Sequence, residues 1–508
     1  MKVAMTGVSG HMGAEALEQS VGLDGVEWVR ILLTPKKRNF RLAKRLKRRY
    51  GTRLQVVFGD LSDPSACERL VADTDYVINM AAVIPPRSDA APKESERCNF
   101  LGAKALTDAV KAMPRQAKFL HTSTIALYGC RNEKHPFCRV GDPLVISPYD
   151  FYSLHKLYGE RYVLEAGLEH FVVLRQTAML YPAMLRCNMS DGLMFHTCLN
   201  SPLEWVSARD SGYLIRRILE RDSAGEVDFF SNRVYNLGGG QHGRQTGYDT
   251  FRDGFAVMGG STEKFFRPDW LAARNFHGVW MEDGDELEAL FGYQRDGVEE
   301  VWQEIGRKHR IYRLAALLPP KLIAGTFFRH LLGHPNSPMR WKRDGDTALV
   351  YAFFGDLPQP SDWKDVPLMA KGDFGDYDAL RAGRGAEDKR LSHGFDDKKP
   401  PQTWTAEDCM QAAKFRGGAF DAASFAGAHL PATWHCHAGH AFTATPYTVM
   451  GAGHWCPKCA PRPWDFDAQA KHNPFYAQVW YDTHGRDENV RYDVDAAGKA
   501  VMEHTEEV

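Results

Sequence analysis

The sequence lacks an excess of charge of either sign. Its 63 lysines and arginines are matched by 64 aspartates and glutamates, which leaves a net charge of −1 at pH 7. A balanced chain has no bulk attraction for a polyanion, so we expect no nucleic-acid partner. Long apolar runs are missing as well. None reaches the ~18 residues that span a bilayer, and the N-terminus has no basic and apolar leader, so we expect a cytoplasmic protein.

Cysteine is scarce, with ten residues among 508. The first seven are spread from Cys67 to Cys409 without a repeated spacing, which excludes a disulfide framework and is typical of reduced thiols. The last three lie close together beyond residue 430, as metal ligands would. The chain is also too long for one compact domain, so we expect two or three.

The N-terminus carries the first functional pattern. An apolar run at Lys2–Met5 is followed by T-G-x-x-G-x-x-G and then by good helix formers. Gly7 would permit a tight turn, Gly10 would let backbone N–H groups approach phosphates, and Gly13 would let helix and strand pack closely. The pattern predicts a dinucleotide whose pyrophosphate lies at a helix N-terminus.

Four further apolar segments indicate strands, with helical patterns between them. The strands are expected at 26–34, 54–58, 75–79 and 117–121, and the helices at 64–72 and 93–112. This alternation predicts a parallel, doubly wound α/β sheet.

The end of the second strand bears on the choice of dinucleotide. An acidic residue there would bind the ribose 2′-hydroxyl of NAD. This chain instead has Thr34 and Pro35, followed by Lys36, Lys37 and Arg38. Cations are what a 2′-phosphate needs, so the pattern favours NADP, with NAD as the alternative. A solvated basic helix would also explain the cations, because six more follow by residue 49.

Small and polar residues follow the next two strands. Asp60 and Leu61 come after the third strand, and the Asp60 carboxylate could bind the adenine amino group. Ala81 comes after the fourth strand and is small where a flat cofactor must pass. Taken singly, each of these residues is explained as well by the fold.

A tyrosine and a lysine stand four residues apart in YSLHK, from Tyr152 to Lys156. On a helix they share a face. A lysine cation beside a phenol lowers the pKa of the phenol, which can then exchange a proton with an alcohol near neutral pH. Thr124, at the end of the fifth strand, could hold the substrate oxygen. The three residues together predict acid–base chemistry.

Residues 1 to about 300 resemble the extended short-chain dehydrogenase/reductases of the epimerase/dehydratase-like branch. The matching segments are TGVSGHMG, GDL at 59–61, MAA at 80–82, ERCN at 96–99, TSTIALYG at 122–129, YSLHK at 152–156, LR at 174–175, WVSARD at 205–210 and YNLGGG at 235–240. The resemblance implies a Rossmann-type doubly wound sheet with a smaller α/β substrate lobe. It also implies hydride transfer between a substrate carbon and a nicotinamide.

The resemblance implies roles for single residues. Tyr152 would be the catalytic acid or base, with Lys156 lowering its pKa and binding the ribose. Thr124 would orient the substrate oxygen, and Asn99 would relay protons and position a helix. Together with the motifs above, the expected cofactor contacts are Gly7, Gly10, His11, Met12, Gly13, Lys37, Arg38, Asp60, Leu61, Ala81 and Lys156.

Differences from the family's motifs reduce the number of reactions that we expect. The dehydratases carry Thr-Asp-Glu where this chain has Thr-Ile-Ala from Thr124, so we set dehydration aside. The epimerases have an asparagine shortly after the arginine of their sixth strand, whereas Arg175 is followed by Gln-Thr-Ala-Met. Apolar residues at 179–184 and 193–195 fit an apolar substrate, although most of them also fit the core of the lobe.

We therefore expect an NADP(H)-dependent oxidoreductase that forms a homo-oligomer and acts on a small to medium, largely apolar alcohol or ketone, either steroid-like or another carbonyl compound. One alternative is a nucleotide-sugar 4-epimerase, which would retain NAD tightly and show no net redox turnover. The other is a dinucleotide-sensing binding protein that signals through a zinc module. Such a sensor would not need the proton relay of Thr124, Tyr152 and Lys156.

The second half of the chain is less regular. Helical periodicity over 283–306 is expected to close the substrate lobe. The apolar, cation-containing segment 311–332 fits a lobe-capping helical hairpin, a dimer face or a membrane-surface helix, favoured in that order. Residues 356–402 predict a linker. In the tail, aromatic pieces at 475–476 and 479–481 resemble strands.

The C-terminal part contains a metal-ligand pattern. Cys436-x3-His440 is followed after fifteen residues by Cys456-x2-Cys459. Four such ligands leave no open position, which predicts a structural zinc ion in a zinc-ribbon-like or treble-clef-like module. Few cations lie near this pattern, which argues against nucleic-acid binding by the zinc module. The module is expected instead to bind a partner, to dimerise or to cap the active site. Other histidines that could serve as the fourth ligand are His435, His437 and His454.

These patterns divide the chain into four parts. Residues 1–310 are the dehydrogenase/reductase region, 311–402 a helical extension and linker, 403–465 the zinc module and 466–508 the tail. A capping-box pattern from Thr405 predicts a helix start inside the zinc module.

Overall fold

The computed structural model describes residues 1–184, 191–319, 322, 324–460 and 463–505. Cys187 lies outside these residues, and the nine described cysteines are free thiols. Among the described residues, no helix is long and apolar enough to span a bilayer.

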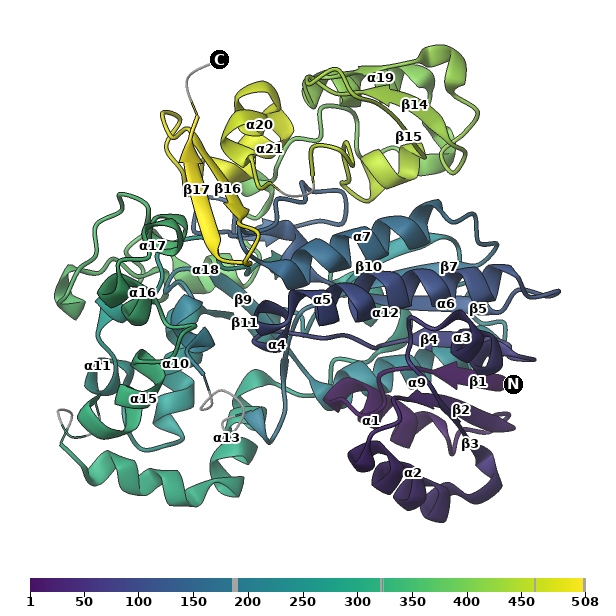
Figure 1. The fold of residues 1–508 in the computed structure, drawn as a ribbon, viewed down its shortest axis with the longest axis horizontal. Coiled ribbons are helices and arrows are strands. Elements are labelled where there is room, and N and C mark those ends of the chain that lie inside the picture. Colours follow the sequence, from purple (N-terminus) through teal and green to yellow (C-terminus); the bar gives the residue numbers. More distant parts are fainter. Residues whose placement is uncertain (185–190, 320–321, 323, 461–462, 506–508) are drawn as a thin grey trace.

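A seven-stranded parallel sheet forms the centre of the N-terminal part (Figure 1). Its order is β10-β7-β5-β4-β1-β2-β3. The strands are β1 (Lys2–Met5), β2 (Trp28–Leu33), β3 (Leu54–Phe58), β4 (Tyr76–Asn79), β5 (Lys118–Thr124), β7 (Phe171–Gln176) and β10 (Arg233–Leu237). Apolar runs fill these strands because helices cover both faces of the sheet. The predicted doubly wound α/β sheet is confirmed.

Two layers of helices enclose the sheet (Figure 1). One layer contains α1 (His11–Ser20), α2 (Lys37–Tyr50), α9 (Ala208–Ser223) and α12 (Asp285–Phe291). The other contains α3 (Pro64–Val71), α6 (Gly102–Lys111) and α7 (Phe151–Glu165). The carboxyl ends of the strands therefore meet at one edge, between the two layers.

The helix predicted over 93–112 is confirmed, with a π-helical turn inside it. After the short α4 (Arg87–Ala90), the chain is helical without a break through α5 (Pro92–Ser95), the π-helical η2 (Glu96–Leu101) and α6. A π turn accommodates an extra residue and is common at functional sites. Here it contains Asn99, whose side chain bonds to the loop after β4, a tertiary contact that helical periodicity does not reveal.

A smaller α/β lobe follows the sheet. Its three-stranded sheet has the order β11-β9-β8, and helices pack around it. The elements are β8 (Ala178–Leu180), β9 (Pro202–Ser207), β11 (Arg244–Thr246), α10 (Gly247–Ala256), α11 (Thr262–Phe265) and α13 (Val298–Lys308). The periodicity over 283–306 corresponds to two helices, because Gly292 ends α12 in the left-handed region at φ 60°.

The segment after α13 covers the lobe only with its second half. Its elements are the 3-10 helix η7 (Arg310–Leu317), the π-helical η8 (Ala324–Phe328) and α15 (Arg329–Leu332), followed by α16 (Pro338–Asp344), α17 (Thr347–Phe354) and α18 (Tyr377–Arg381). Phe328 and Leu331 are buried in the aromatic cluster of the lobe. Leu314 and Leu317 in η7 are exposed. The lobe-capping hairpin, our first interpretation, therefore holds for only half of the segment.

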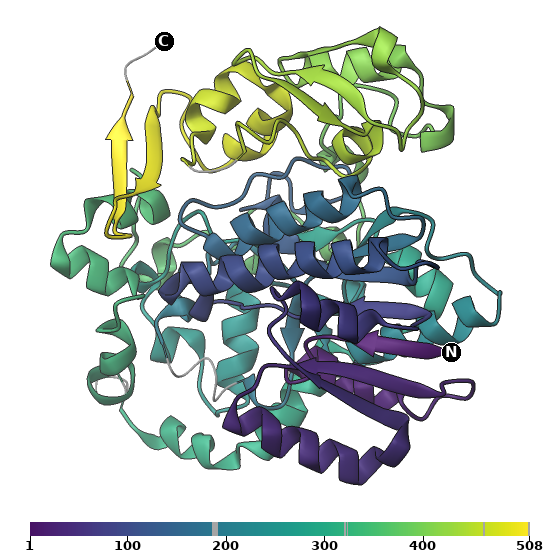
Figure 2. The same cartoon turned by 45° about the vertical axis from the view of Figure 1, so that its right-hand side comes forward.

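The C-terminal elements lie across α7 (Figures 1 and 2). They are α19 (Ala406–Phe415), β13 (Ala419–Phe420), β14 (Ala432–His435), β15 (Ala441–Ala444), α20 (Phe466–His472), α21 (Pro474–Trp480), β16 (Val490–Val494) and β17 (Ala500–His504). The capping box at Thr405 is confirmed. The strand-like pieces predicted in the tail belong instead to α21 or its C-terminal end, because Asn473 caps that helix and Pro474 begins it.

Candidate functional site

The glycine turn between β1 and α1 has the geometry that a dinucleotide site needs. Gly7 has φ +74°, and a Cβ there would lie 2.4 Å from the carbonyl oxygen of Met80. A Cβ on Gly13 would lie 2.4 Å from the carbonyl oxygen of Gly7. Gly10 is the N-cap of α1 and offers no side-chain hydrogen bond to the first turn. The N–H groups at this helix N-terminus, which include those of His11 and Met12, can therefore bind an anion.

Thr6, which sequence reasoning did not single out, fixes the turn against β4. Its hydroxyl donates to Oδ1 of Asn79 at 2.6 Å and accepts from the N–H groups of Met80 and Ala81 at 3.1 Å each. The threonine before the first glycine was the available signal. Through this bond, Ala81 is held beside the glycine turn, as its predicted role requires.

The basic residues after β2 lie near the glycine turn. Lys37 and Arg38 are exposed in the first turn of α2. Burial and the nearby Arg38 cation lower the pKa of His11. The His11 ring also stacks on Tyr181, with 3.8 Å between ring centroids. The first turns of α1 and α2 and the substrate lobe therefore meet at this edge of the sheet.

The predicted adenine ligand already has partners. Asp60 follows β3, where its Oδ1 accepts from the backbone and hydroxyl of Ser62, and its Oδ2 lies 3.3 Å from Arg97. The carboxylate is about one-third exposed. The side chain of Leu61 is buried and packs against Gly102, so only its backbone could contact a cofactor.

The predicted catalytic residues converge at the junction of β5 and α7. Asp150 caps α7 by accepting from the N–H of Ser153 at 2.9 Å, which places Tyr152 in the first turn. Burial raises the pKa of Tyr152 to about 12, and a hydrogen bond with Thr124 partly offsets this. The Thr124 hydroxyl also accepts from the N–H of Ala126 at 3.2 Å. The hydroxyls of Tyr152 and Thr124 therefore share one site.

Lys156 departs from its expected arrangement. Its ammonium donates to the carbonyl oxygen of Thr122, and burial lowers its pKa to about 8. Burial is therefore the main influence on the pKa of Tyr152, and the lysine bonds to the end of β5. The lowering of the phenol pKa by Lys156 stays a prediction.

Asn99 connects the loop after β4 to α7. Its side chain accepts from the N–H of Val83 and donates to the carbonyl oxygen of Val83, both at 2.8 Å. It also donates to Ser95 at 3.1 Å. A Cβ on Gly159 of α7 would lie 2.6 Å from the Asn99 carbonyl oxygen. Asn99 is therefore placed to position α7, while its proton relay stays a prediction.

Most apolar residues expected near a substrate are core residues. Leu180 and Met184 are buried in one lobe cluster and Phe195 in another. Gln176, at the end of β7, is half-buried, and its amide oxygen has no hydrogen-bond partner among the described residues. Sequence reasoning missed it, although its position one residue after Arg175 was the signal.

A cleft of about 1140 Å³ lies elsewhere. It is lined by residues from the loop after β5, the lobe and the tail, among them Cys130, Arg274 and His484. Tyr152, Thr124 and the glycine turn do not line it. Its size alone therefore does not make it the catalytic site.

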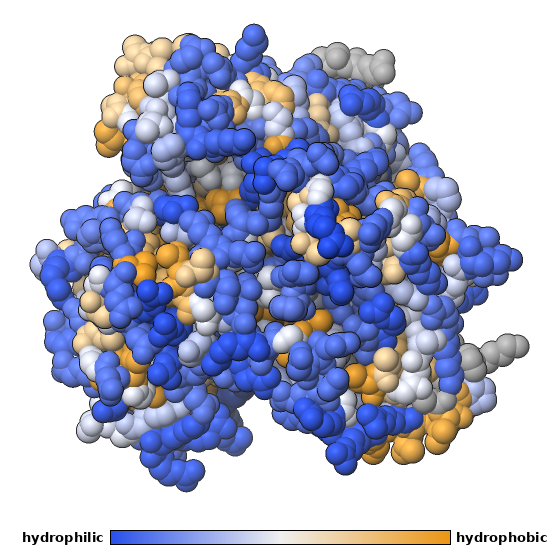
Figure 3. Space-filling model, turned by 180° about the vertical axis from the view of Figure 1, so that it is seen from behind, coloured by the Kyte–Doolittle hydropathy of each residue, from blue (hydrophilic) through white to orange (hydrophobic). Residues whose placement is uncertain are grey.

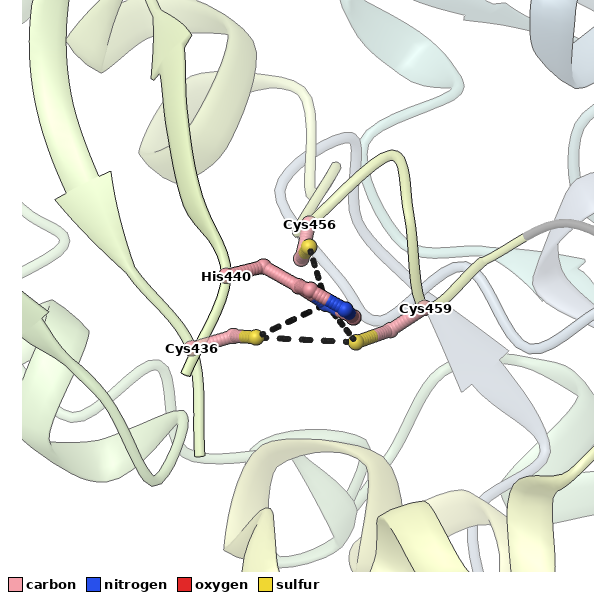
Figure 4. Close-up of side chains that lie close together, drawn as sticks. All are labelled: Cys436, His440, Cys456 and Cys459. Carbon is pink, nitrogen blue, oxygen red and sulfur yellow. Dashed lines mark hydrogen bonds between the residues drawn. The ribbon is translucent and has the colours of Figure 1, made fainter. Parts of the chain in front are cut away.

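The four predicted metal ligands converge at one point (Figure 4). Their ligand atoms lie within 4.8 Å of one another. Cys436 Sγ is 3.4 Å from His440 Nδ1 and 3.6 Å from Cys459 Sγ, and Cys456 Sγ is 3.7 Å from His440 Nδ1. A zinc ion about 2.3 Å from each sulfur and about 2.0 Å from a nitrogen would separate tetrahedral ligands by about 3.5 to 3.8 Å. The donor set and its spacing therefore fit zinc.

The competing histidines have other environments. His435 is exposed at the end of β14. His437 stacks on His472, with 5.2 Å between ring centroids. His454 Nε2 lies 2.9 Å from Oε1 of Glu160.

Buried contacts join α7 to residues 452–455, the loop just before Cys456. Glu160 accepts from Arg175 at 2.6 Å and pairs with His454. Arg175 also donates to the carbonyl oxygen of Ala452 at 2.6 Å, and Arg161 donates to that of Trp455 at 2.5 Å. Burial opposes the charge of Glu160, but Arg175 and His454 outweigh it and lower its pKa. The helix that carries Tyr152 is therefore bonded to the residues just before Cys456.

The fold and the glycine turn define a dinucleotide-binding domain of the Rossmann type. Residues 3–238 match the model of the NAD dependent epimerase/dehydratase family. This part of the chain is therefore similar to that family, and its parallel sheet is of the Rossmann type.

Two curated relatives match part of the chain. It is 31% identical over 121 residues to D-erythronate dehydrogenase of Cupriavidus necator, and 32% identical over 123 residues to dTDP-4-dehydrorhamnose reductase of Mycolicibacterium smegmatis. Each match spans 24% of this chain and only 36% of the relative's length.

Solved structures resemble the chain at low identity. The dTDP-glucose 4,6-dehydratase of Bacillus anthracis, in complex with NAD, is 16% identical, with a TM-score of 0.47, over 62% of this chain and 99% of its own. The UDP-Glc/GlcNAc 4-epimerase of Campylobacter jejuni is 18% identical, with a TM-score of 0.46, over 61% of this chain and 99% of its own.

Proposed function

We propose that the protein is an NADP(H)-dependent oxidoreductase that interconverts a small alcohol and its ketone. The observation that carries this proposal is the shared site of Tyr152 and Thr124 at the carboxyl end of β5. Both curated relatives are named for net redox reactions, as a dehydrogenase and a reductase. The dinucleotide would supply or take up the hydride.

The residues of the chain would manage the oxygen and its proton. Thr124 would hold the substrate oxygen, and Tyr152 would give or take its proton. Lys156, now bonded to the Thr122 carbonyl, would bind the ribose. Its position one helical turn from Tyr152 supports that role.

The cofactor preference rests on charge. Lys37 and Arg38 lie at the start of α2, and no acid follows β2. Arg38 also lies close enough to His11 to lower its pKa. A 2′-phosphate at this edge of the sheet would meet two cations, which supports NADP over NAD.

The substrate is proposed to be small and largely apolar. Support comes from Met179 and Tyr181, which are half-buried where β8 leaves the sheet edge. Gln176 adds one polar group, whose amide oxygen has no hydrogen-bond partner within the described part of the chain. A reducing, cytoplasmic compartment is supported by the free thiols of the described cysteines.

The cluster of Cys436, His440, Cys456 and Cys459 is proposed to hold a structural zinc ion. Four protein ligands occupy every position of a tetrahedron, so water has no place on the metal. The contacts of Glu160 and Arg161 with the preceding loop support a role in holding α7.

Cofactor binding tests the proposal and its main alternative. Tryptophan fluorescence would be titrated with NADPH and NADH, and native mass spectrometry would detect retained nucleotide. We expect preference for NADPH and no retained nucleotide. Tightly retained NAD without net turnover would instead support a nucleotide-sugar 4-epimerase, the reaction named for the Campylobacter jejuni structure.

A dinucleotide-sensing protein makes a different prediction. A sensor that signals through the zinc cluster would function without Tyr152 but not without Cys456. A cellular phenotype that survives Tyr152→Phe and is lost with Cys456→Ser would therefore replace the oxidoreductase proposal.

A further inference from the structure

One short segment holds the three most exposed large apolar side chains among the described residues. Ile311, Leu314 and Leu317 are 73, 62 and 81% exposed. They stand three residues apart on the 3-10 helix η7. Side chains three apart eclipse one another on such a helix, so they form one stripe. Leu318, the next residue, is 42% exposed.

This apolar surface lies at one edge of the molecule. Apolar residues gather at the lower right of the space-filling view (Figure 3), which corresponds to the lower left of Figure 1, where η7 follows α13. The described residues 307–318, which we call the basic apolar segment, begin at the end of α13 and include η7.

Cations follow the same spacing as the apolar stripe. Arg307, Arg310 and Arg313 are three apart and exposed, and Lys308 is exposed beside Arg307. Among the described residues, none of these four cations forms an ion pair, and the neighbouring Glu304 pairs instead with Arg209. The sequence has no aspartate or glutamate from residue 305 to residue 343. In a chain with a net charge of −1, this is a strong local separation of charge.

The basic apolar segment is held to the substrate lobe next to the stripe. His309 Nε2 lies 2.9 Å from the carbonyl oxygen of Pro182. The exposed stripe therefore begins two residues after a fixed point on the lobe.

The charge pattern distinguishes between two possible partners of this surface, a second copy of the chain and a lipid bilayer. In a two-fold dimer the same patch would meet itself, and the row of arginines would face a second row without acids between them. An anionic bilayer offers phosphates and carboxylates to the arginines and acyl chains to the leucines.

We infer that the basic apolar segment is a docking site for the surface of an anionic lipid bilayer, which the apolar stripe of η7 enters while the flanking arginines bind lipid headgroups. Docking would hold the substrate lobe at the membrane without a spanning helix. It is independent of the redox reaction, so it can hold or fail whatever the substrate proves to be.

Co-sedimentation with vesicles tests the inference. Purified full-length protein would be mixed with phosphatidylcholine vesicles, with or without 30% phosphatidylserine, at about 0.1 M salt. We expect binding to the anionic vesicles that weakens at high salt. Arg310→Glu/Arg313→Glu should reduce the partition coefficient by at least about fivefold for each cation. Leu314→Asn/Leu317→Asn should reduce it by at least tenfold.

Matched controls lie on α2, the other basic helix. Arg45 and Arg48 are exposed there, and Arg45→Glu/Arg48→Glu changes the same charge away from the stripe. The control should bind vesicles as the parent does. Three results would overturn the inference: no binding of the parent protein, unchanged binding of Leu314→Asn/Leu317→Asn, or loss only in the α2 control. A dimer dispersed by the leucine changes, without vesicle binding, would identify the patch as a dimer face.

Discussion

The proposed catalytic junction and the proposed metal cluster are built from residues with very different spacing. The four candidate metal ligands lie between Cys436 and Cys459, within one hairpin and the loop that follows η14 (Tyr447–Gly451). The proposed catalytic junction would combine the glycine turn at Gly7 with Tyr152 and Lys156, which lie on the same edge of the sheet because its parallel strands end there. The metal cluster can form locally, whereas the catalytic junction needs the whole sheet.

The two sites also differ in access. The proposed metal cluster has four protein ligands and no open position, while at the proposed catalytic junction the first turn of α1 has no side-chain cap. Yet they are connected, because Glu160 and Arg161 lie on the same helix as Tyr152. Helix α7 therefore connects the proposed metal cluster to the proposed catalytic junction.

The largest expected effect is that of removing the metal from the proposed cluster. A structural zinc ion contributes on the order of 10–16 kcal/mol to the folding of a small module. We therefore expect Cys456→Ser to abolish metal binding and unfold the region around β14 and β15. Elemental analysis and hydrogen exchange would measure both effects.

Cys98→Ser provides the control for the metal prediction. Cys98 is a half-buried free thiol outside the cluster, so its replacement should leave the metal content at one ion per chain. A parent protein that contains no zinc, and keeps β14 and β15 protected with a chelator present, would contradict the structural role.

Tyr152→Phe would separate chemistry from binding. General acid–base catalysis contributes about 10²- to 10⁴-fold, so we expect kcat to fall in this range while the dinucleotide Kd is unchanged. Tyr162→Phe on the same helix removes a hydroxyl that bonds Asp108 at 2.6 Å and should have almost no effect on kcat. Equal losses in the two variants would show that Tyr152 acts only on the stability of α7.

Glu160→Gln tests the connection between the sites. The change leaves the Arg175 cation buried without a counter-charge, which costs about 3–5 kcal/mol. We expect a lower free energy of unfolding in urea and faster release of zinc to a chelator. Glu165→Gln, which breaks a partly exposed pair with Arg161, should cost less than about 1 kcal/mol. Zinc release at the parental rate in Glu160→Gln would show that the two sites are independent.

Lys37→Ser/Arg38→Ser would measure the charge argument for NADP. A charge-assisted hydrogen bond contributes about 1.5–3 kcal/mol, so the Kd for NADPH should rise at least tenfold while that for NADH stays constant. Lys44→Ser/Arg48→Ser, further along α2, is the matched control. A parallel change for both dinucleotides would remove the basis for preferring NADP.

The sequence predicted those features that depend on residues close together in the chain. The strands, the glycine turn and the four metal ligands each follow from local spacing, and the structure brings them together as expected. The contact of His454 with Glu160 spans 294 positions, and no local pattern marks it. The hydrogen bond of the Lys156 ammonium was missed for a similar reason, because its acceptor is a backbone carbonyl of β5.

The smallest expected effect concerns the attachment of the predicted linker. His393 lies between Asp142 at 2.8 Å and Asp397 at 3.0 Å. Burial would lower the pKa of His393, but these carboxylates outweigh it and raise the pKa above its usual value near 6.5. A raised pKa means that the protonated form stabilises the fold. The contribution is complete below the unfolded pKa and is lost as the pH rises through the folded pKa.

We therefore expect the Tm to fall as the pH is raised from about 6 to about 8, with a smaller fall in His393→Gln. His504→Gln, in the exposed hairpin strand β17, is the control and should keep the parental pH dependence. An identical pH profile in His393→Gln would mean that His393 is neutral in the fold. The segment would then be held by contacts that do not titrate in this range, such as Arg139, which donates to Asp397 at 2.9 Å and to the Leu391 carbonyl at 2.8 Å, and Ser392, whose N–H donates to Gln478 at 2.7 Å. These bonds persist at either pH, so the predicted linker would remain docked.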